Sequence, residues 1–207
     1  MHRSTPLATL RCTLALALLA AAGCATATSS AERSVAEQSG YTPAAFVSGG
    51  PEPGRAAPDF NLPWASRDTA GGPDDPYGLW KDRGKVIVLA FYPHDFTHTD
   101  SLELATFRDR YDDLFGPDVI VAGVSVDPLA THARFARTLE LPFRLLSDPD
   151  QAVARRYGSS DTGGIDRRTV FVIGRDGMVV WRAMKFKATD PKAYNELQQA
   201  VRAARRG

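Results

Sequence analysis

The sequence contains very little cysteine. Cys12 and Cys24 are its only two among 207 residues, so none follows position 24. Disulfide frameworks and thiol catalysis both need a cysteine sulfur. Both are therefore excluded from the long remainder of the chain.

An excess of charge of either sign is also missing. The 25 Lys and Arg residues face 24 Asp and Glu residues, which gives a formal net charge of +1. The two signs alternate along the chain, without the basic stripe that usually binds a polyanion. Nucleic acid is therefore not expected as a partner.

The apolar run near the start, TLALALLAAAG at residues 13–23, is too short to span a bilayer comfortably. It follows Arg3 and Arg11 and ends in small residues, a pattern typical of a secretory signal rather than a transmembrane helix. We predict that residues 1–23 are removed, which leaves 23 basic and 24 acidic residues in a protein outside the cytoplasm.

The exit of this signal, AAGC, resembles the lipobox of bacterial lipoproteins. The resemblance implies that Cys24 is acylated and binds membrane lipid, which would hold a periplasm-facing protein at the cell envelope. Ala25 is not the aspartate that commonly retains lipoproteins at the inner membrane, so the outer membrane is favoured. A plain cleaved signal followed by an incidental cysteine is the alternative.

The rest of the chain divides into a linker and a domain. Residues 24–53 are rich in Ala, Ser, Gly and Pro without periodicity, which predicts a flexible tether. In the domain, residues 54–207, continuous β-branched apolar runs predict strands covered on both faces. These runs lie at 84–93, 118–126, 168–174 and 178–184.

Helical patterns lie between and after these runs. Leu104, Phe107, Tyr111 and Leu114 follow the spacing of an amphipathic helix. Asp127-Pro128 and Asp190-Pro191 each predict a helix start, with an N-cap carboxylate before a proline. The turn GRDG predicts a hairpin between the last two strands. The order β-α-β-α-β-β-α predicts a thioredoxin-like α/β sandwich, with a mixed central sheet and helices on both faces.

Several segments resemble the peroxiredoxins of the alkyl hydroperoxide reductase and thiol-specific antioxidant group. They are AAPDFNLP at 56–63, LPFRLLSDPDQAVARRYG at 141–158 and RTVFVIGRDGMVVW at 168–181. The resemblance implies a thioredoxin fold, an opening strand in the first segment and an antioxidant oxidoreductase without a cofactor. Members of the family dimerise through strand edges or active-site loops, so a homodimer is compatible with it.

The chemistry of that family depends on the motif P-x-x-x-T-x-x-C and on an arginine before a later strand. Pro93 and Thr97 match the motif, Glu103 matches an acid in the following turn and Arg168 matches the arginine. Asp100 stands where the peroxidatic cysteine would be. Peroxide cleavage needs a sulfur that survives as sulfenic acid, which a carboxylate cannot provide. The resemblance therefore implies an anion-friendly pocket that has lost its catalytic residue.

Asp100 allows two interpretations that need no metal. Asp100 and Glu103 have the spacing of a capping box, which predicts a helix whose N-cap is Asp100 and a pairing of Asp100 with Arg168. A carboxylate also resembles a cysteine sulfinate, so the domain would imitate a hyperoxidised peroxiredoxin. In that case it is a binding or regulatory module, with an envelope protein as its partner.

A metal site is the third interpretation. His94 and His98 lie in the same loop and are acceptable ligands for zinc, copper or iron. The protein would then be an oxidoreductase that acts through a bound metal, or else through a partner's thiol. His132, on an early turn of a later helix, is expected to be exposed to solvent.

Overall fold

The computed structural model describes residues 49–207. The predicted signal at 1–23, the acylation of Cys24 and most of the predicted tether lie outside the described residues. Among the residues that it describes, no helix is both long and apolar enough to cross a membrane.

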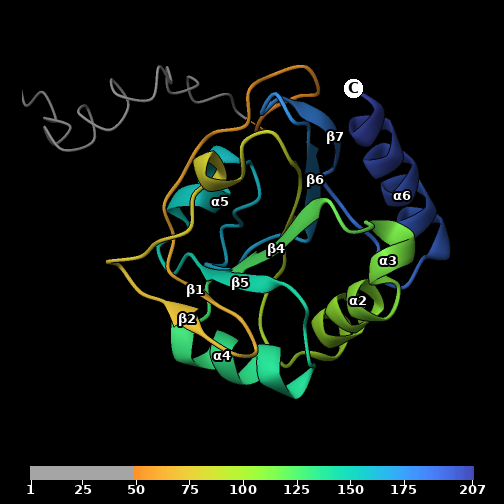
Figure 1. The fold of residues 1–207 in the computed structure, drawn as a ribbon. Coiled ribbons are helices and arrows are strands. Elements are labelled where there is room, and N and C mark those ends of the chain that lie inside the picture. Colours follow the sequence, from red (N-terminus) through yellow and green to blue (C-terminus); the bar gives the residue numbers. More distant parts are fainter. Residues whose placement is uncertain (1–48) are drawn as a thin grey trace, which may run out of the picture. The chain divides into compact units, whose positions relative to one another are not determined.

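A seven-stranded sheet in the order β2-β1-β5-β4-β3-β6-β7 forms the centre of the domain (Figure 1). The parallel strands are β3 (Val86–Phe91), β4 (Val119–Ser125) and β5 (Arg144–Ser147). β6 (Thr169–Ile173) pairs antiparallel with β3, and β7 (Val179–Ala183) pairs antiparallel with β6. The short strands β1 (Trp64–Ala65) and β2 (Ala70–Gly71) complete the other edge.

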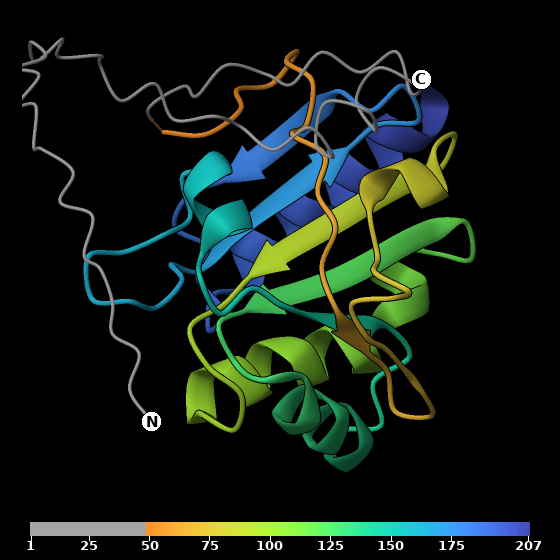
Figure 2. The ribbon, with the colours of Figure 1, turned by 90° about the vertical axis from the view of Figure 1, so that its left-hand side faces the viewer.

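Helices cover both faces of the sheet. They are η1 (Leu79–Asp82), α2 (His98–Asp109), α3 (Tyr111–Leu114), α4 (Leu129–Thr138), α5 (Ala152–Arg156) and α6 (Pro191–Arg206). Val86, Val88 and Ala90 of β3 belong to the core under α2, α4 and α6. Ile87, Leu89 and Phe91 belong to the core under α5 and the segment before η1. Figure 2 shows α6 and α5 on opposite sides of the sheet.

The predicted fold class is confirmed. β3, β4, β6 and β7 lie within the four predicted runs, and every residue of β3 is buried. β5 was not among the predicted strands, because its four residues are too few to show a pattern. The predicted opening strand at 56–63 is wrong, because Ala56 and Leu62 form only isolated bridges.

The two predicted helix caps have different outcomes. Asp190 caps α6 as predicted, since its side chain accepts a hydrogen bond from Lys192 N. The cap predicted at Asp127 is wrong, because α4 follows Pro128 and receives no side-chain cap. The Asp127 carboxylate accepts from Asp95 N at 2.8 Å and from Ser125 Oγ at 2.8 Å instead. The carboxylate of Asp127 is therefore bound by these two donors instead of by the free amides at the start of α4.

The beginning of the described chain is attached to the domain. The Arg182 guanidinium donates to the carbonyl oxygens of Gly49 and Gly50, and Gly54 N donates to Val179 O. Gly50 has a φ of 76°, and a Cβ there would lie 2.0 Å from Tyr157 O, so only glycine fits. Residues 49–53, predicted as part of the tether, therefore pack against the folded domain.

The sheet topology collects several loops at one end. The parallel strands β3, β4 and β5 all finish there, and the antiparallel strand β6 starts there, with Phe91 paired to Thr169. The loop after β3 therefore lies beside the residues that precede β6.

Candidate functional site

The loop between β3 and α2 contains most of the predicted site residues. It starts at Pro93, directly after Tyr92, whose amide donates to Val124 O of β4. Its last residue, Thr97, is the N-cap of α2 and accepts a hydrogen bond from Asp100 N at 3.2 Å. The prediction that Asp100 is the N-cap is therefore wrong. The threonine hydroxyl reaches the free amides first, and Asp100 becomes the third residue of the helix.

The Asp100 side chain is 1% exposed and is held by three donors. Its Oδ2 accepts from Thr97 Oγ1 at 2.5 Å and from His94 N at 3.1 Å. Its Oδ1 lies 2.5 Å from Arg168 Nη1, and this is a charge contact rather than a well-aimed hydrogen bond. Both oxygens of the carboxylate are thus fixed inside the protein.

Glu103 lies one turn further along α2 and is fully buried. Arg168 Nη1 donates to its Oε2, while its Oε1 has no hydrogen-bond partner. The pKa of Glu103 is raised to about 7, mainly by burial and to a smaller extent by the nearby Asp100, against the lowering effect of Arg168. The cluster therefore holds two carboxyl groups and one guanidinium.

Arg168 reaches this cluster because of the strand topology. It directly precedes β6, whose first residue pairs with the last residue of β3. Burial lowers the pKa of Arg168, but the neighbouring Glu103 and Asp100 outweigh burial and hold this pKa above its ordinary value. The predicted pairing of Arg168 with Asp100 is confirmed.

The anion-friendly pocket expected around Thr97, Asp100 and Arg168 is filled by the protein's own carboxylate. The hydroxyl, the backbone amide and the guanidinium that could hold an external anion all contact Asp100. Two buried side-chain atoms of the cluster lack a hydrogen-bond partner, Asp100 Oδ1 and Glu103 Oε1, and both are acceptors. The site is therefore short of donors rather than of acceptors.

The two candidate metal ligands do not form part of a three-ligand group in the described residues. His94 Nδ1 is 3.5 Å from Asp127 Oδ1, and His98 is exposed as the first residue of α2. Within residues 49–207, no group of three or more His, Cys, Asp or Glu side chains is arranged to hold a metal. The geometry gives the metal interpretation no support.

His132 is buried, so its predicted exposure is wrong. It faces the interior because His132, Phe135 and Ala136 follow the spacing of the buried face of α4. Its Nδ1 is 2.9 Å from Asp95 Oδ2, and Tyr92 Oη donates to Asp95 Oδ1 at 2.7 Å. Sequence reasoning missed this network, although the helical phase of His132 could have indicated its burial.

A second buried carboxyl group was also missed. Asp166, two residues before Arg168, is 1% exposed and accepts from Gln151 Nε2 at 2.8 Å. Its pKa is raised to about 7, mainly by burial and to a smaller extent by Asp148 and Asp127, against the lowering effect of the Gln151 hydrogen bond. Its isolated position in the sequence offered no signal.

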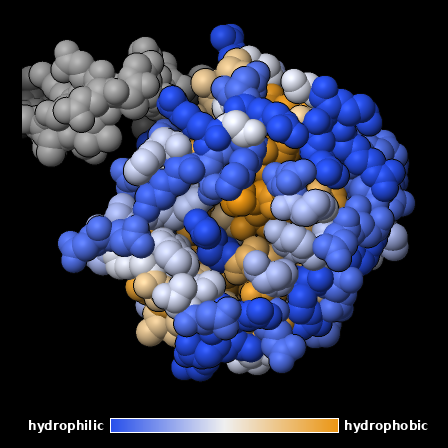
Figure 3. Space-filling view, viewed as in Figure 1, coloured by the Kyte–Doolittle hydropathy of each residue, from blue (hydrophilic) through white to orange (hydrophobic). Residues whose placement is uncertain are grey.

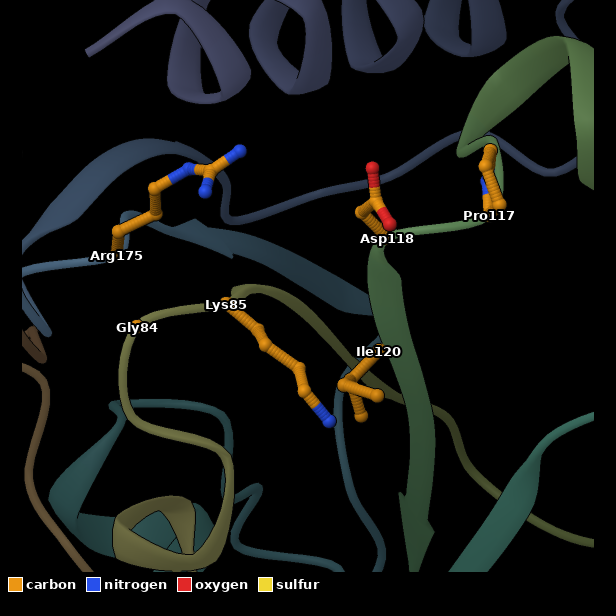
Figure 4. Close-up of a pocket in the computed structure, with 6 residues that line it drawn as sticks. All are labelled: Gly84, Lys85, Pro117, Asp118, Ile120 and Arg175. Atoms are coloured by element: carbon orange, nitrogen blue, oxygen red, sulfur yellow. The ribbon is translucent and has the colours of Figure 1, made fainter.

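The opposite end of the sheet carries an open pocket of about 220 Å³. Gly84 and Lys85 precede β3, Pro117 and Asp118 precede β4, and Arg175 follows β6 (Figure 4). Ile120 supplies an apolar side chain. A space-filling view shows apolar residues in a hollow of one face, framed by hydrophilic ones (Figure 3). None of the predicted site residues lines the pocket.

Comparison with known proteins identifies the family. The AhpC/TSA family matches residues 53–182, which include the loop after β3, α2 and Arg168. The chain belongs to the AhpC/TSA family. It is therefore a peroxiredoxin-like member of the thioredoxin superfamily.

Individual AhpC/TSA proteins resemble the chain over most of their length. A putative peroxiredoxin bcp of Coxiella burnetii is 35% identical over 144 residues, which are 65% of this chain and 90% of that protein. The structure of the peroxidoxin BcpB from Mycobacterium tuberculosis matches with a TM-score of 0.63 at 27% identity, over 74% of this chain and 97% of the other. A reduced 2-Cys peroxiredoxin of Plasmodium vivax has a TM-score of 0.64 at 23% identity, over 74% and 96% of the two chains, and shows the shared fold.

Proposed function

We propose that this protein is a peroxiredoxin-like module of the bacterial cell envelope that has lost its catalytic cysteine and acts by binding. The family supplies the antioxidant and redox context. Asp100 takes the place of the peroxidatic cysteine after Pro93 and Thr97, and no cysteine follows position 24. Such a site reduces a peroxide by oxidising its cysteine sulfur to sulfenic acid, and a carboxylate cannot be oxidised in this way.

The observation that carries this proposal is the placement of the Asp100 carboxylate. Both oxygens are buried and held, one by Thr97 Oγ1 and His94 N and the other by Arg168. A carboxylate fixed in this way is neither a free base nor an available nucleophile. Its role is then structural: it holds the loop after β3 and Arg168 in one arrangement.

The state that it imitates is a hyperoxidised cysteine. In a sulfinate, as in a carboxylate, two oxygens are bonded to one central atom and share one negative charge. Asp100 would present this charge permanently to the donors of the site. We infer that the partner is an envelope protein that recognises the domain in this state, which the acylated Cys24 would keep at the membrane.

The experiment that tests the proposal replaces Asp100 by cysteine in a chain in which Cys12 and Cys24 are both serine. Thr97, Glu103 and Arg168 remain in place, so Asp100→Cys should acquire a thiol pKa below the ordinary value of about 8.5. The new thiol should react with hydrogen peroxide faster than free cysteine does. Adding Arg168→Ala should slow it by about 10² to 10³, through loss of charge stabilisation in the transition state.

Asp100→Ser is the matched control, because it makes a similar change in size without sulfur. It should stay inert, as should the wild type with a thioredoxin-type reductant. Rapid peroxide turnover by metal-free wild-type protein would overturn the proposal. A well-folded Asp100→Cys protein no faster than free cysteine would mean that the site has lost its shape as well as its sulfur.

The envelope location has its own test, Cys24→Ser. When it is expressed in a bacterium that processes lipoproteins, the wild type should enter the detergent phase on phase separation, because acyl chains on Cys24 anchor it. The variant should stay in the aqueous phase with its domain folded. Wild-type protein found in the aqueous phase would contradict the lipoprotein assignment but leave the proposal for Asp100 untouched.

A further inference from the structure

A second buried network, separate from the contacts of Asp100, joins the loop after β3 to α4 and β5. Tyr92 Oη donates to Asp95 Oδ1 at 2.7 Å, and Asp95 Oδ2 lies 2.9 Å from His132 Nδ1. His132 Nε2 lies 3.1 Å from Leu146 O of β5. The side chains of Asp95 and His132 are both fully buried. The function proposed above does not use this network.

The partners of the imidazole define where its protons are. A carbonyl oxygen such as Leu146 O only accepts, so Nε2 of His132 must carry a hydrogen. Nδ1 faces a carboxylate oxygen of Asp95, and two lone pairs at 2.9 Å in a dry site would repel. A proton therefore lies between Nδ1 and Oδ2, on one atom or the other.

Besides His132, the side chains that contact Asp95 are a tyrosine and a second aspartate. Tyr92, at the end of β3, stays a donor because burial and then Asp95 raise its pKa well above the ordinary value. Asp127, between β4 and α4, accepts from Asp95 N and adds negative charge. Within the described part of the chain, Asp95 makes no ion pair with a Lys or Arg. Loss of the shared proton would leave an uncompensated buried charge, which is strongly destabilising.

The loop is attached to α4 at the next residue as well. Phe96 has a φ of 61°, in the left-handed region, and its ring lies 4.7 Å from that of Phe135 and under the guanidinium of Arg134 at 5.1 Å. The following residue is Thr97, which caps α2 and contacts Asp100. The placement of the cap thus depends on how the loop is attached to α4.

We propose that Asp95 and His132 share one buried proton, and that this proton fastens the loop 93–97 to α4 and so positions Thr97 against Asp100. His132 is thereby a positioning residue. This attachment is independent of whether Asp100 has the role proposed above.

Asp95→Asn separates the shared proton from the attachment itself. An asparagine side chain can accept from Tyr92 Oη and donate its amide hydrogen to a neutral His132 Nδ1. This variant should keep the loop attached while it removes the shared proton. His132→Leu removes the attachment, and His98→Leu, at an exposed histidine, is the matched control.

The experiment is NMR on the full chain. The wild type should show a far-downfield proton that is absent from Asp95→Asn and His132→Leu and present in His98→Leu. Amide exchange at 95–100 should be at least about tenfold faster in His132→Leu than in the wild type. Asp95→Asn should remain protected.

Two results would overturn the inference. One is a folded wild type without the downfield proton at neutral pH. The other is a downfield proton that persists in Asp95→Asn. If His132→Leu does not fold, Asp95→Asn still decides between the outcomes.

Discussion

The two ends of the central sheet differ in how deeply their charged side chains are buried. At the end where β3 finishes, Asp100 and Glu103 are buried with Arg168 between them. At the other end Lys85 and Asp118 line an open pocket, with side chains 53% and 70% exposed. The concave surface is therefore at one end and the desolvated charge at the other.

This contrast follows from the connections at each end. The loops after β3 and before β6 meet over the strand ends and remove their polar groups from water, so those groups must pair with one another. The charged groups at the other end lie in short connections before β3 and β4 and keep their hydration. Perturbed carboxyl groups are a better guide to a functional site here than the shape of the surface.

The largest expected effect comes from breaking the buried end with Arg168→Ala. Without its guanidinium, Asp100 and Glu103 are two unpaired buried carboxyl groups, which should lower the free energy of unfolding by about 3–5 kcal/mol at neutral pH. Chemical denaturation of the full chain measures this. A decrease in the free energy of unfolding below about 1 kcal/mol would mean that water takes the place of the arginine. The two ends would then no longer differ in the cost of removing a charged side chain.

The next effect concerns pH. The folded-state pKa of Glu103, about 7, lies above its ordinary value of 4.5, so its contribution to stability is complete below pH 4.5 and is lost as pH rises to 7. Glu103→Gln should shrink that decline by an amount on the order of 3 kcal/mol. The pKa of Asp166 is raised in the same direction, so part of the decline should remain. Denaturation midpoints from pH 4 to 8 test this, and an unchanged slope would contradict it.

The smallest effect is expected at the open end. Lys85 pairs with Asp82 at 2.9 Å, but the lysine side chain is 53% exposed and the pair is screened by water. Lys85→Ala should therefore change the free energy of unfolding by no more than about 0.5 kcal/mol, as surface ion pairs usually do. A loss comparable to that of Arg168→Ala would show that burial does not distinguish the two ends.

Some parts of the fold could be predicted because their signals are local. Continuous apolar runs located β3, β4, β6 and β7, and Asp190 before Pro191 located the start of α6. Other local signals were misleading where two groups compete for one partner. Thr97, and not Asp100, is the N-cap of α2. The Asp127 carboxylate accepts from the amide of Asp95 and the hydroxyl of Ser125 instead of capping α4.

The sequence by itself determined the family, the sandwich of helices on a mixed sheet, and a domain that contains no cysteine. These properties depend on residue identity and periodicity, which are present in every short segment. The pairing of Asp100 with Arg168 was predicted, but only the tertiary structure decided that Thr97 and His94 bind the same carboxylate and that Asp95 and His132 meet in the interior. Arg168 is far from Asp100 in sequence, and His132 from Asp95. Their contacts exist because β6 runs antiparallel to β3 and α4 packs beneath the loop, which no local pattern specifies.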